Sequence, residues 1–427
     1  MSSQYARRVV DSFLDDFQPH LRALALQGPK AVGKTATASQ RARTVYDLSD
    51  DQVREIVAAD PGVLTSAPGP VLVDEWQRLP AVWDMVKRAV DAGSPPGHFI
   101  LAGSSVPQGA QIHSGAGRIV PLRMRPLSLA ERRLQEPSVS LADLLEGGAG
   151  LAGATEVILR DYVREITASG LPHLRTLPAP VREIELDAYL DNVVTKEFPE
   201  QGYTVRRPAA LMSWLTAYAA ATCTQTDYTK IVAAAAFAKD SQPSKNTIIA
   251  WREALESLWL LEPVPAWPGH PALPALASKE THQLTDTALA TRLLHLDEAR
   301  LLRGESGSTT LPPVKGATKS VLGRLFENLV TSSVRTYSDA ARAQVFHLRT
   351  AKGDHEVDII IQRPDGKVLA IEVKLATTVD ADDARHLRWL REKLGDDLVD
   401  AVVVTTGSHA YRRPDGVGVV PVALLGP

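Results

Sequence analysis

An uninterrupted phosphate-loop motif near the N-terminus constrains this chain more than any other sequence feature. It matches the pattern G-x-x-x-x-G-K-[ST], in which glycines let backbone N–H groups close around phosphate oxygens. An apolar run over residues 21–27 precedes the motif and a helical pattern over residues 34–43 follows it. The sequence therefore predicts an α/β domain with ATP bound at a helix N-terminus. The motif consists of Gly28, Pro29, Lys30, Ala31, Val32, Gly33, Lys34 and Thr35.

Four side chains carry the chemistry expected at this site. Lys34 neutralises the β- and γ-phosphates, and the hydroxyl of Thr35 holds Mg²⁺. A second apolar run, residues 71–74, ends in Asp74 and is followed by Glu75. As a strand, this run places Asp74 to hold Mg²⁺ through a water and Glu75 to polarise the attacking water. Acidic residues at strand ends are common, so this assignment depends on the phosphate loop.

Further apolar runs over residues 44–48 and 99–102 alternate with helical patterns, as in a parallel sheet covered on both faces. Ser104 and Ser105 follow the second run, where Ser104 can sense the γ-phosphate; a serine-rich turn is the alternative. A strand over residues 118–124 contains Pro121, which favours a sheet edge. Arg118 is a candidate arginine finger for a neighbouring subunit, and a solvated or ion-paired arginine is the alternative.

A Gly-rich stretch and a second stretch rich in Gly, Ser, Thr and Pro divide the chain. They lie at residues 146–155 and 304–317 and read as interdomain breaks. We therefore expect an ATPase domain over residues 1–150, a helical domain over residues 151–310 and a third domain over residues 311–427.

The middle domain carries the pattern of a winged helix-turn-helix. A helix begins near Ser244, and two short strands are expected over residues 260–266 and 276–284. The first turns of this helix could meet DNA phosphates and base edges. A winged helix that only packs between protein domains is the alternative. The candidate DNA-binding residues are Lys245, Asn246, Thr247 and Arg252.

The last domain contains two predicted strands joined by the turn sequence at residues 363–367. Asp358 lies on the first strand, whereas Glu372 and Lys374 share one face of the second. Glu327, on a preceding helix, would complete a set that holds Mg²⁺ or Mn²⁺ and activates water for phosphodiester hydrolysis. The arrangement resembles the PD-(D/E)XK nucleases, without their proline before Asp358 or a glutamine in the following helix. A solvated charged face, or a fold without cleavage, is the alternative.

Composition limits the location and the partners. The chain of 427 residues has 44% hydrophobic residues and one cysteine, Cys223, which fits a reducing cytoplasm and excludes an intramolecular disulfide. No secretory signal or membrane span is expected. The net charge of −3 requires any nucleic-acid surface to be local.

The phosphate loop together with VLVDEWQ, ILAGSS, SGAGRI and RPLSLAE resembles a bacterial and archaeal family of AAA-type ATPases. Members of that family carry a winged-helix middle segment and a C-terminal nuclease-like domain. The resemblance implies that Tyr5 and Arg8 lie near the nucleotide base. By analogy with AAA motors, it also implies a ring-shaped homo-oligomer such as a hexamer.

These features predict an ATPase that translocates on or remodels double-stranded or branched DNA. The intact set of Glu327, Asp358, Glu372 and Lys374 favours this function. The alternative is a nucleotide-dependent switch that binds proteins and uses the nuclease-like fold as a platform. The acidic pI of about 6.4, with no polybasic stripe, favours the switch.

Overall fold

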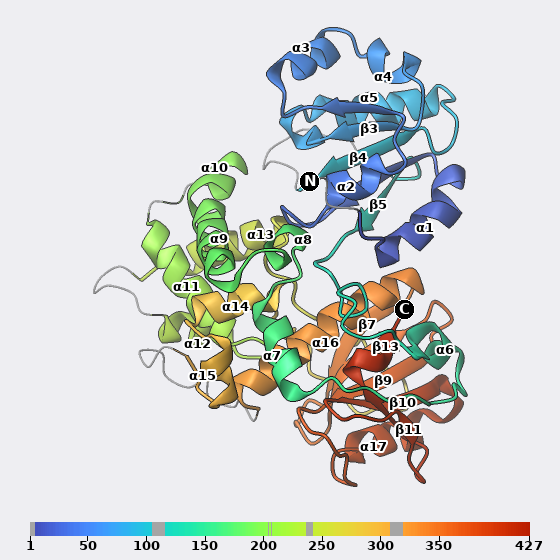
Figure 1. Ribbon diagram of the computed structural model, residues 1–427, viewed down its shortest axis with the longest axis vertical. Coiled ribbons are helices and arrows are strands. Elements are labelled where there is room, and N and C mark those ends of the chain that lie inside the picture. Colours follow the sequence, from blue (N-terminus) through green and yellow to red (C-terminus); the bar gives the residue numbers. More distant parts are fainter. Residues whose placement is uncertain (1–4, 105–115, 204, 206, 236–241, 308–318) are drawn as a thin grey trace.

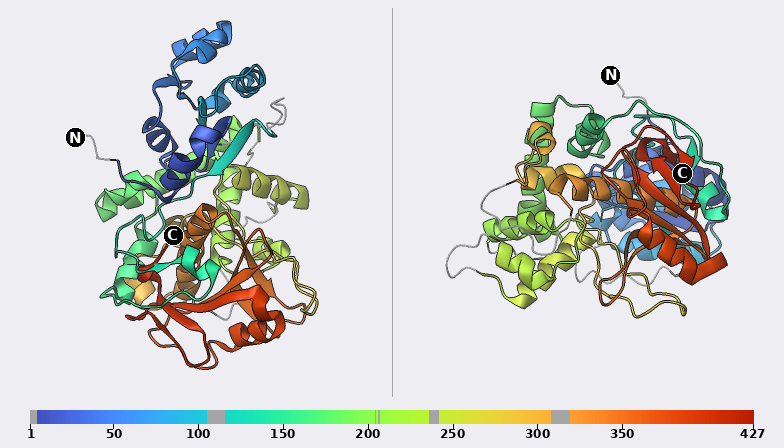
Figure 2. Two further views of the ribbon diagram at one scale, coloured as in Figure 1. Left: turned by 90° about the vertical axis from the view of Figure 1, so that its right-hand side faces the viewer. Right: turned by 90° about the horizontal axis from the view of Figure 1, so that it is seen from below.

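The computed structural model describes residues 5–104, 116–203, 205, 207–235, 242–307 and 319–427. The N-terminal domain lies at one end of the long axis, and the C-terminal sheet lies at the other (Figure 1). The helical middle domain lies beside both, and the view at right angles shows the same order along the long axis (Figure 2). The expected position of Ser105, the boundary at 310 and most of the second break fall outside the described residues. No described helix is both long enough and apolar enough to cross a bilayer.

The N-terminal domain is built on a parallel sheet with the strand order β2-β3-β4-β1-β5. This confirms the predicted parallel α/β domain, including the edge position of the strand that contains Pro121. Because all five strands run parallel, their carboxyl ends meet at one edge. The strands are β1 (Ala23–Gln27), β2 (Thr44–Asp47), β3 (Val71–Asp74), β4 (Phe99–Gly103) and β5 (Ile119–Arg123). The helices are α1 (Val9–Phe17), α2 (Lys34–Ser39), α3 (Asp51–Ala59), α4 (Gly62–Ser66) and α5 (Ala81–Asp91).

The two faces of this sheet bury different side chains, because successive residues of a strand point to opposite faces. Ala25 and Val73 pack into a cluster with α5 that is confined to the N-terminal domain. Leu26, Leu72 and residues around them belong to a larger cluster that continues through the other two domains. One face of the sheet is therefore continuous with the rest of the molecule.

The middle domain is helical, as the sequence predicts. Its last long helix, α13, begins at Lys245 because the side chain of Ser244 accepts a hydrogen bond from the Thr247 N–H at 3.2 Å. The helices are α7 (Leu159–Thr167), α8 (Pro172–Arg175), α9 (Ala179–Asn192), α10 (Phe198–Glu200), α11 (Pro208–Ala220), α12 (Tyr228–Ala234), α13 (Lys245–Ser257), α14 (Thr287–Leu293) and α15 (Glu298–Leu302). A π-helical turn, Val193–Glu197, joins α9 to α10.

The two strands expected after α13 are not regular strands, and that prediction was wrong. Their segments pair only through isolated antiparallel bridges, Leu261 with Leu284 and Val264 with Thr281. Pro263 and other prolines in the first segment lack the N–H that a continuous ladder requires.

The C-terminal domain is a six-stranded mixed sheet with the order β11-β12-β10-β9-β8-β7. The hairpin of β8 and β9 is antiparallel and its turn lies at residues 363–367, as predicted. Helix α16 packs against β7 and α17 against β8, β9 and β10. The elements are α16 (Val321–Ala340), β7 (Gln344–Arg349), β8 (Glu356–Gln362), β9 (Val368–Val373), α17 (Arg385–Leu394), β10 (Leu398–Thr405), β11 (Tyr411–Arg412) and β12 (Gly418–Pro421).

A short segment that follows the N-terminal domain lies on the C-terminal sheet. Strand β6 (Val139–Ser140) pairs in parallel with β13 (Leu425–Gly426), close to the end of the chain. Helix α6 (Leu141–Glu146) packs on α16, β9 and β10 (Figure 1). These residues precede the boundary expected at 150, so the first part of the chain contributes structure to both ends of the molecule.

Candidate nucleotide site

The phosphate loop lies at the carboxyl edge of the N-terminal sheet, between β1 and α2. Gly28 has a φ of +156°, and a Cβ at this position would lie 2.2 Å from the carbonyl oxygen of Met124. Gly33 precedes α2 with a φ of +100°, a conformation that favours glycine. Ala31 also has a positive φ, +63°. The two glycines of the motif are therefore required by close approach and by backbone conformation.

Lys34 is folded into the loop that precedes it. Its Nζ donates hydrogen bonds to the carbonyl oxygens of Gly28 at 2.9 Å and Pro29 at 2.8 Å, and the residue is 7% exposed. Burial lowers the pKa of Lys34 to about 8, although Glu75 and Asp74 oppose the shift. The ammonium group thus lies where phosphate oxygens can replace the carbonyl oxygens.

Thr35 and Asp74, the two residues expected to hold the metal, lie side by side. The Thr35 hydroxyl donates to Asp74 Oδ2 at 2.8 Å. Burial raises the pKa of Asp74, and the hydrogen bond from Thr35 opposes this shift. A hydroxyl and a carboxylate are the hard oxygen donors that suit Mg²⁺, so these residues fit the ion. Glu75 adjoins them with a φ of +51°, and its carboxylate accepts a hydrogen bond from Gln77 Nε2.

Ser104 and the remaining residues of the phosphate loop lie next to other parts of the chain. Ser104 directly follows β4 and is buried, and its Oγ has no hydrogen-bond partner among the described residues. Lys30 lies 3.3 Å from Glu197 and 3.6 Å from Glu200 of the middle domain. Val32 is buried in the larger core cluster. The nucleotide site therefore borders the middle domain directly.

The segment before β1 forms hydrogen bonds with the phosphate loop and with α2. Tyr5 donates to Asp11 at 2.6 Å and lies within hydrogen-bond distance of Thr37 on α2. Arg8 donates to the carbonyl oxygen of Val32 at 2.9 Å and pairs with Glu131 at 2.9 Å. The proximity of Tyr5 and Arg8 to the nucleotide base stays a prediction.

Arg118 lies at the opposite edge of the sheet. It precedes β5, whose first residue is paired with Ala23 at the amino end of β1. Its side chain is half-exposed and forms an ion pair with Asp91 at 2.8 Å. From this position Arg118 can serve only the nucleotide site of another subunit, so its role as an arginine finger stays a prediction.

Residues 20–132 match the AAA domain family. This region is an AAA-type ATPase domain. Such a domain hydrolyses ATP and uses a divalent metal such as Mg²⁺. Residues 159–300 match a domain of unknown function, DUF8612, and residues 322–425 match another, DUF4143.

The chain as a whole resembles proteins of other organisms. The uncharacterized proteins Mb2031c of Mycobacterium bovis and Rv2008c of Mycobacterium tuberculosis are each 23% identical over 406 residues, which cover 93% of this chain and 79% of each relative. The Walker-type ATPase PABY2304 of Pyrococcus abyssi aligns with a TM-score of 0.37 and 15% identity over 69% of this chain and 99% of that chain.

Sequence reasoning missed Arg123, the last residue of β5. This arginine is paired in register with Gln27, which immediately precedes the phosphate loop of the AAA domain. Its guanidinium lies 3.7 Å from the ring centroid of Trp259 and 3.6 Å from Glu262, both in the middle domain. Only the order of strands in the sheet brings Arg123 to the nucleotide site, and no local sequence signal reports that order.

The carboxylates that were expected to form a nuclease-like site in the C-terminal domain do form a cluster. Lys319 was not expected there, yet its Nζ donates to Glu327 at 2.8 Å and to both oxygens of Asp358 at 2.8 Å. Glu372 is buried beside Asp358, and burial raises its pKa well above the usual range. Lys374 instead lies 3.6 Å from Asp383.

This cluster, as arranged, does not fit Mg²⁺ or Mn²⁺. The ammonium group of Lys319 takes the oxygens of Asp358 that a metal would need. Within the described ranges, no three histidine, cysteine or carboxylate side chains are grouped so as to hold a metal ion. The geometry supplies a buried ion-pair network, in which Lys319 neutralises the carboxylates, and no hydrolytic step follows from it.

The candidate DNA-binding residues divide into two groups. Lys245 and Asn246 are exposed at the start of α13. Arg252 instead lines an open groove of about 900 Å³ formed by residues of the middle domain, and it lies 3.3 Å from Glu256 and 3.7 Å from Glu280. Thr247 is partly buried by the cap of α13.

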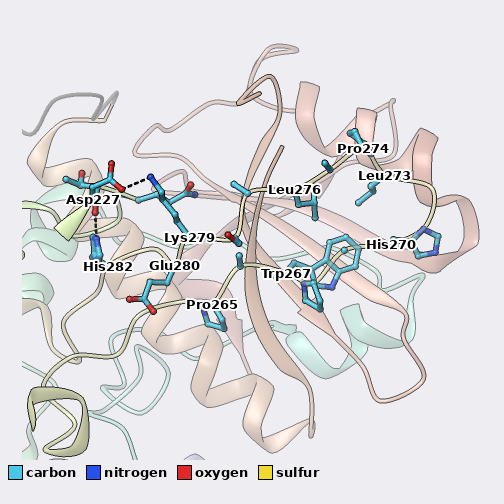
Figure 3. A pocket seen from close by; sticks show the side chains of 18 of the residues that line it. Asp227, Pro265, Trp267, His270, Leu273, Pro274, Leu276, Lys279, Glu280 and His282 are labelled. Carbon is cyan, nitrogen blue, oxygen red and sulfur yellow. Dashed lines mark hydrogen bonds and ion pairs between the residues drawn. The ribbon is translucent and has the colours of Figure 1, made fainter. Parts of the chain in front are cut away.

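The groove has a charged half and an apolar half (Figure 3). Asp227, Lys279 and Glu280 lie toward one end, and Trp267 and Leu276 lie toward the other. Asp227 accepts from Lys279 at 2.6 Å, so the charges of the groove are largely paired with one another.

Proposed function

We propose that this chain is a Mg²⁺-dependent ATPase that works as a nucleotide-dependent switch, in which ATP binding and hydrolysis change the packing of the AAA domain on the other two domains. The observation that carries the proposal is the position of Arg8. Its guanidinium contacts the carbonyl oxygens of Val32 in the phosphate loop and of Arg125, and also the carboxylate of Glu131.

The segment from Arg125 to Glu131 continues this connection into the other domains. Arg125 pairs with Glu262 of the middle domain at 2.8 Å and with Asp339 of α16. The N–H of Leu129 donates to Ser333 of α16 at 3.1 Å. A change in the phosphate loop is therefore linked through Arg8 to a junction where all three domains meet, which we name the three-domain junction (Arg125, Glu262, Arg335 and Asp339).

ATP itself would be held by the groups already described. Lys34 binds the phosphate oxygens, and the pair of Thr35 and Asp74 holds Mg²⁺ when the ion is present, which lowers the charge repulsion at the terminal phosphate. Glu75 orients the attacking water. Lys34→Ala should abolish ATP hydrolysis, and retained turnover would contradict this assignment.

Amide hydrogen exchange tests the switch. A non-hydrolysable ATP analogue with Mg²⁺ should change the protection of residues 125–131, 258–264 and 325–340 relative to the nucleotide-free protein. Lys34→Ala, which cannot hold the phosphates, should show no change at the same analogue concentration. A change confined to the phosphate loop would show that nucleotide binding does not reach the three-domain junction.

A second candidate function is ATP-driven translocation on, or remodelling of, double-stranded or branched DNA. The observation that favours it is the exposure of Lys245 and Asn246 at the N-terminus of α13, which follows α11 and α12 in a helical domain and precedes the paired segments around Leu261 and Leu284. This is the order of elements in a winged helix. A ring-shaped homo-oligomer would supply Arg118 to the neighbouring site.

DNA stimulation separates the two candidates. A DNA motor should hydrolyse ATP faster with duplex or branched DNA, and the stimulation should fall with salt because phosphate contacts release counterions. Lys245→Glu should weaken the stimulation, with Lys87→Glu on α5 of the AAA domain as the matched charge control. If no DNA stimulates hydrolysis at low salt, the DNA motor is excluded and the nucleotide-dependent switch is the candidate that remains. Mg²⁺- or Mn²⁺-dependent nicking that disappears in Lys374→Ala would restore the nuclease assignment.

A further inference from the structure

Arg123 is a buried cation whose own hydrogen-bond donors are unused. Its side chain is 13% exposed, and none of its three guanidinium nitrogens has a hydrogen-bond partner among the described residues. A buried guanidinium is ordinarily held by several hydrogen bonds, because leaving a buried charged donor unpaired is costly. Arg123 is therefore poised to accept an anionic partner.

The carboxylate of Glu262, which could pair with Arg123, is already paired with other arginines. Arg125 pairs with Glu262 at 2.8 Å, and Arg335 lies 3.4 Å from the same Oε1 oxygen, whereas Arg123 lies 3.6 Å from Oε2. Three guanidinium groups thus share the one carboxylate of Glu262. Burial lowers the pKa of Arg123 to about 10, although the charge of Glu262 opposes this shift.

Arg123 also lies at the correct edge of the sheet for a nucleotide. Its strand partner, Gln27, leads directly into the phosphate loop, and the Gly28 backbone touches that of Met124. The positive charge of Arg123 contributes to the lowered pKa of Lys34, so the two cations repel each other. An anion bound between them would remove this repulsion.

The opposite face of Arg123 is covered by Trp259, which comes from the middle domain. Trp259 has a φ of +63°, an unusual conformation for a bulky residue, and its indole N–H donates to the carbonyl oxygen of Ser104 at the end of β4. The indole therefore spans the carboxyl edge of the sheet from β4 to β5. Movement of Arg123 would free one face of this ring.

We propose that Arg123 binds the terminal phosphate of ATP held in the same subunit, and that its guanidinium leaves the ring of Trp259 when it does so. This inference rests on the proposed ATPase function and identifies the residue that reads the γ-phosphate. The state of the nucleotide would then reach the middle domain through Trp259 and Glu262. The role differs from that of Arg118, which would act on another subunit.

Steady-state hydrolysis tests the contact with phosphate. Arg123→Gln should lower kcat at least about tenfold, as removal of a donor to a developing charge does. Arg123→Lys should restore part of the rate, because the charge is kept while the planar group is lost. The matched control is Arg303→Gln. Arg303 follows α15, is exposed and forms an ion pair with Glu305, so this variant should hydrolyse ATP at the wild-type rate.

Tryptophan emission tests the movement, with a readout that a structural role would not affect. A non-hydrolysable ATP analogue with Mg²⁺ should change the emission of the wild-type protein, and ADP should not produce the same change. Trp259→Phe and Arg123→Lys should both lose the analogue-specific difference, whereas Arg303→Gln should keep it. Thermal unfolding of each variant establishes that it is folded; if Arg123→Gln is not, Arg123→Lys carries both tests.

The outcomes separate the two proposals. A wild-type protein that neither binds nor hydrolyses ATP overturns the ATPase function and this inference with it. A wild-type protein that hydrolyses ATP, combined with an undiminished kcat in folded Arg123 variants, overturns the inference alone. An analogue-specific emission change that survives in Trp259→Phe overturns the proposed movement.

Discussion

The hydroxyl of Thr35 donates a hydrogen bond to the carboxylate of Asp74, with 2.8 Å between Oγ1 and Oδ2. Thr35 lies in the first turn of α2, and Asp74 ends β3, so the bond crosses the carboxyl edge of the intervening strand β4. The two oxygen donors are thus brought together before any metal is bound.

Asp74→Asn should weaken Mg²⁺ binding while it preserves the local fold, because an amide oxygen can still accept from Thr35. The loss of the negative charge should raise the Mg²⁺ concentration needed for half-maximal ATP hydrolysis by about tenfold or more, the equivalent of about 1.4 kcal/mol. Magnesium titrations of the hydrolysis rate measure this. Asp60→Asn, an exposed carboxylate of the same domain, should leave the requirement unchanged.

The affinity for ATP should fall as the pH rises through the pKa of Lys34. Burial lowers that pKa to about 8 in the nucleotide-free protein, so the ammonium group is lost in mildly alkaline solution. Binding of a fluorescent ATP analogue, titrated between about pH 7 and about pH 9.5, should weaken across this range. The dependence should be absent in Lys34→Arg, which remains charged throughout. An equal slope in both proteins would exclude Lys34 as its source.

Glu262→Gln should destabilise the three-domain junction. The substitution leaves Arg123, Arg125 and Arg335 close together without the carboxylate that they share. Removal of one partner from a buried ion-pair network costs about 3–5 kcal/mol in the free energy of unfolding. Denaturant unfolding measures the loss. Glu305→Gln removes a solvent-screened ion pair instead and should leave the unfolding transition nearly unchanged.

The stability of the C-terminal domain should fall between about pH 5 and about pH 7. Burial raises the pKa of Glu327 from 4.5 to about 7. The folded state therefore binds more protons than the unfolded state in this interval, and the free energy of unfolding decreases as the pH rises. Urea unfolding at the two pH values should show the decrease in the wild type. Glu327→Gln should reduce it, and Glu298→Gln, at the exposed start of α15, should not.

Arg118 should act only between subunits. Arg118→Ala and Lys34→Ala should each be inactive alone, because each lacks one half of every composite site. Mixed oligomers should regain part of the activity, since Lys34→Ala subunits supply an arginine to the intact phosphate loops of the other subunits. Hydrolysis by Arg118→Ala at the wild-type rate would show that Arg118 is only the partner of Asp91.

Local sequence predicted the parts of this molecule whose conformation is decided locally. The glycines at positions 28 and 33, the apolar run ending in Asp74 and the cap at Ser244 each depend on near neighbours in the chain. The regular strands expected after α13 did not form, because prolines such as Pro263 remove ladder donors.

Long-range placement was out of reach of the sequence. Arg123 gains its significance from the pairing of β5 with β1, and Lys319 from the approach of its side chain to Asp358. A lysine beside a Gly- and Pro-rich stretch carries no local sign that it will neutralise two carboxylates. The carboxylates expected to form a metal site do lie together, but Lys319 neutralises them, and that cation was not foreseen.

The pairing of β6 with β13 joins the segment that follows the N-terminal domain to the last strand of the C-terminal domain. Leu425 lies beside Val139, and α6 packs on β9, β10 and α16 of the C-terminal domain. A fragment that starts at residue 319 would lose α6 and expose the apolar surface beneath it, and a fragment that stops at residue 150 would carry α6 with nothing to cover. Either fragment should therefore aggregate when it is expressed alone.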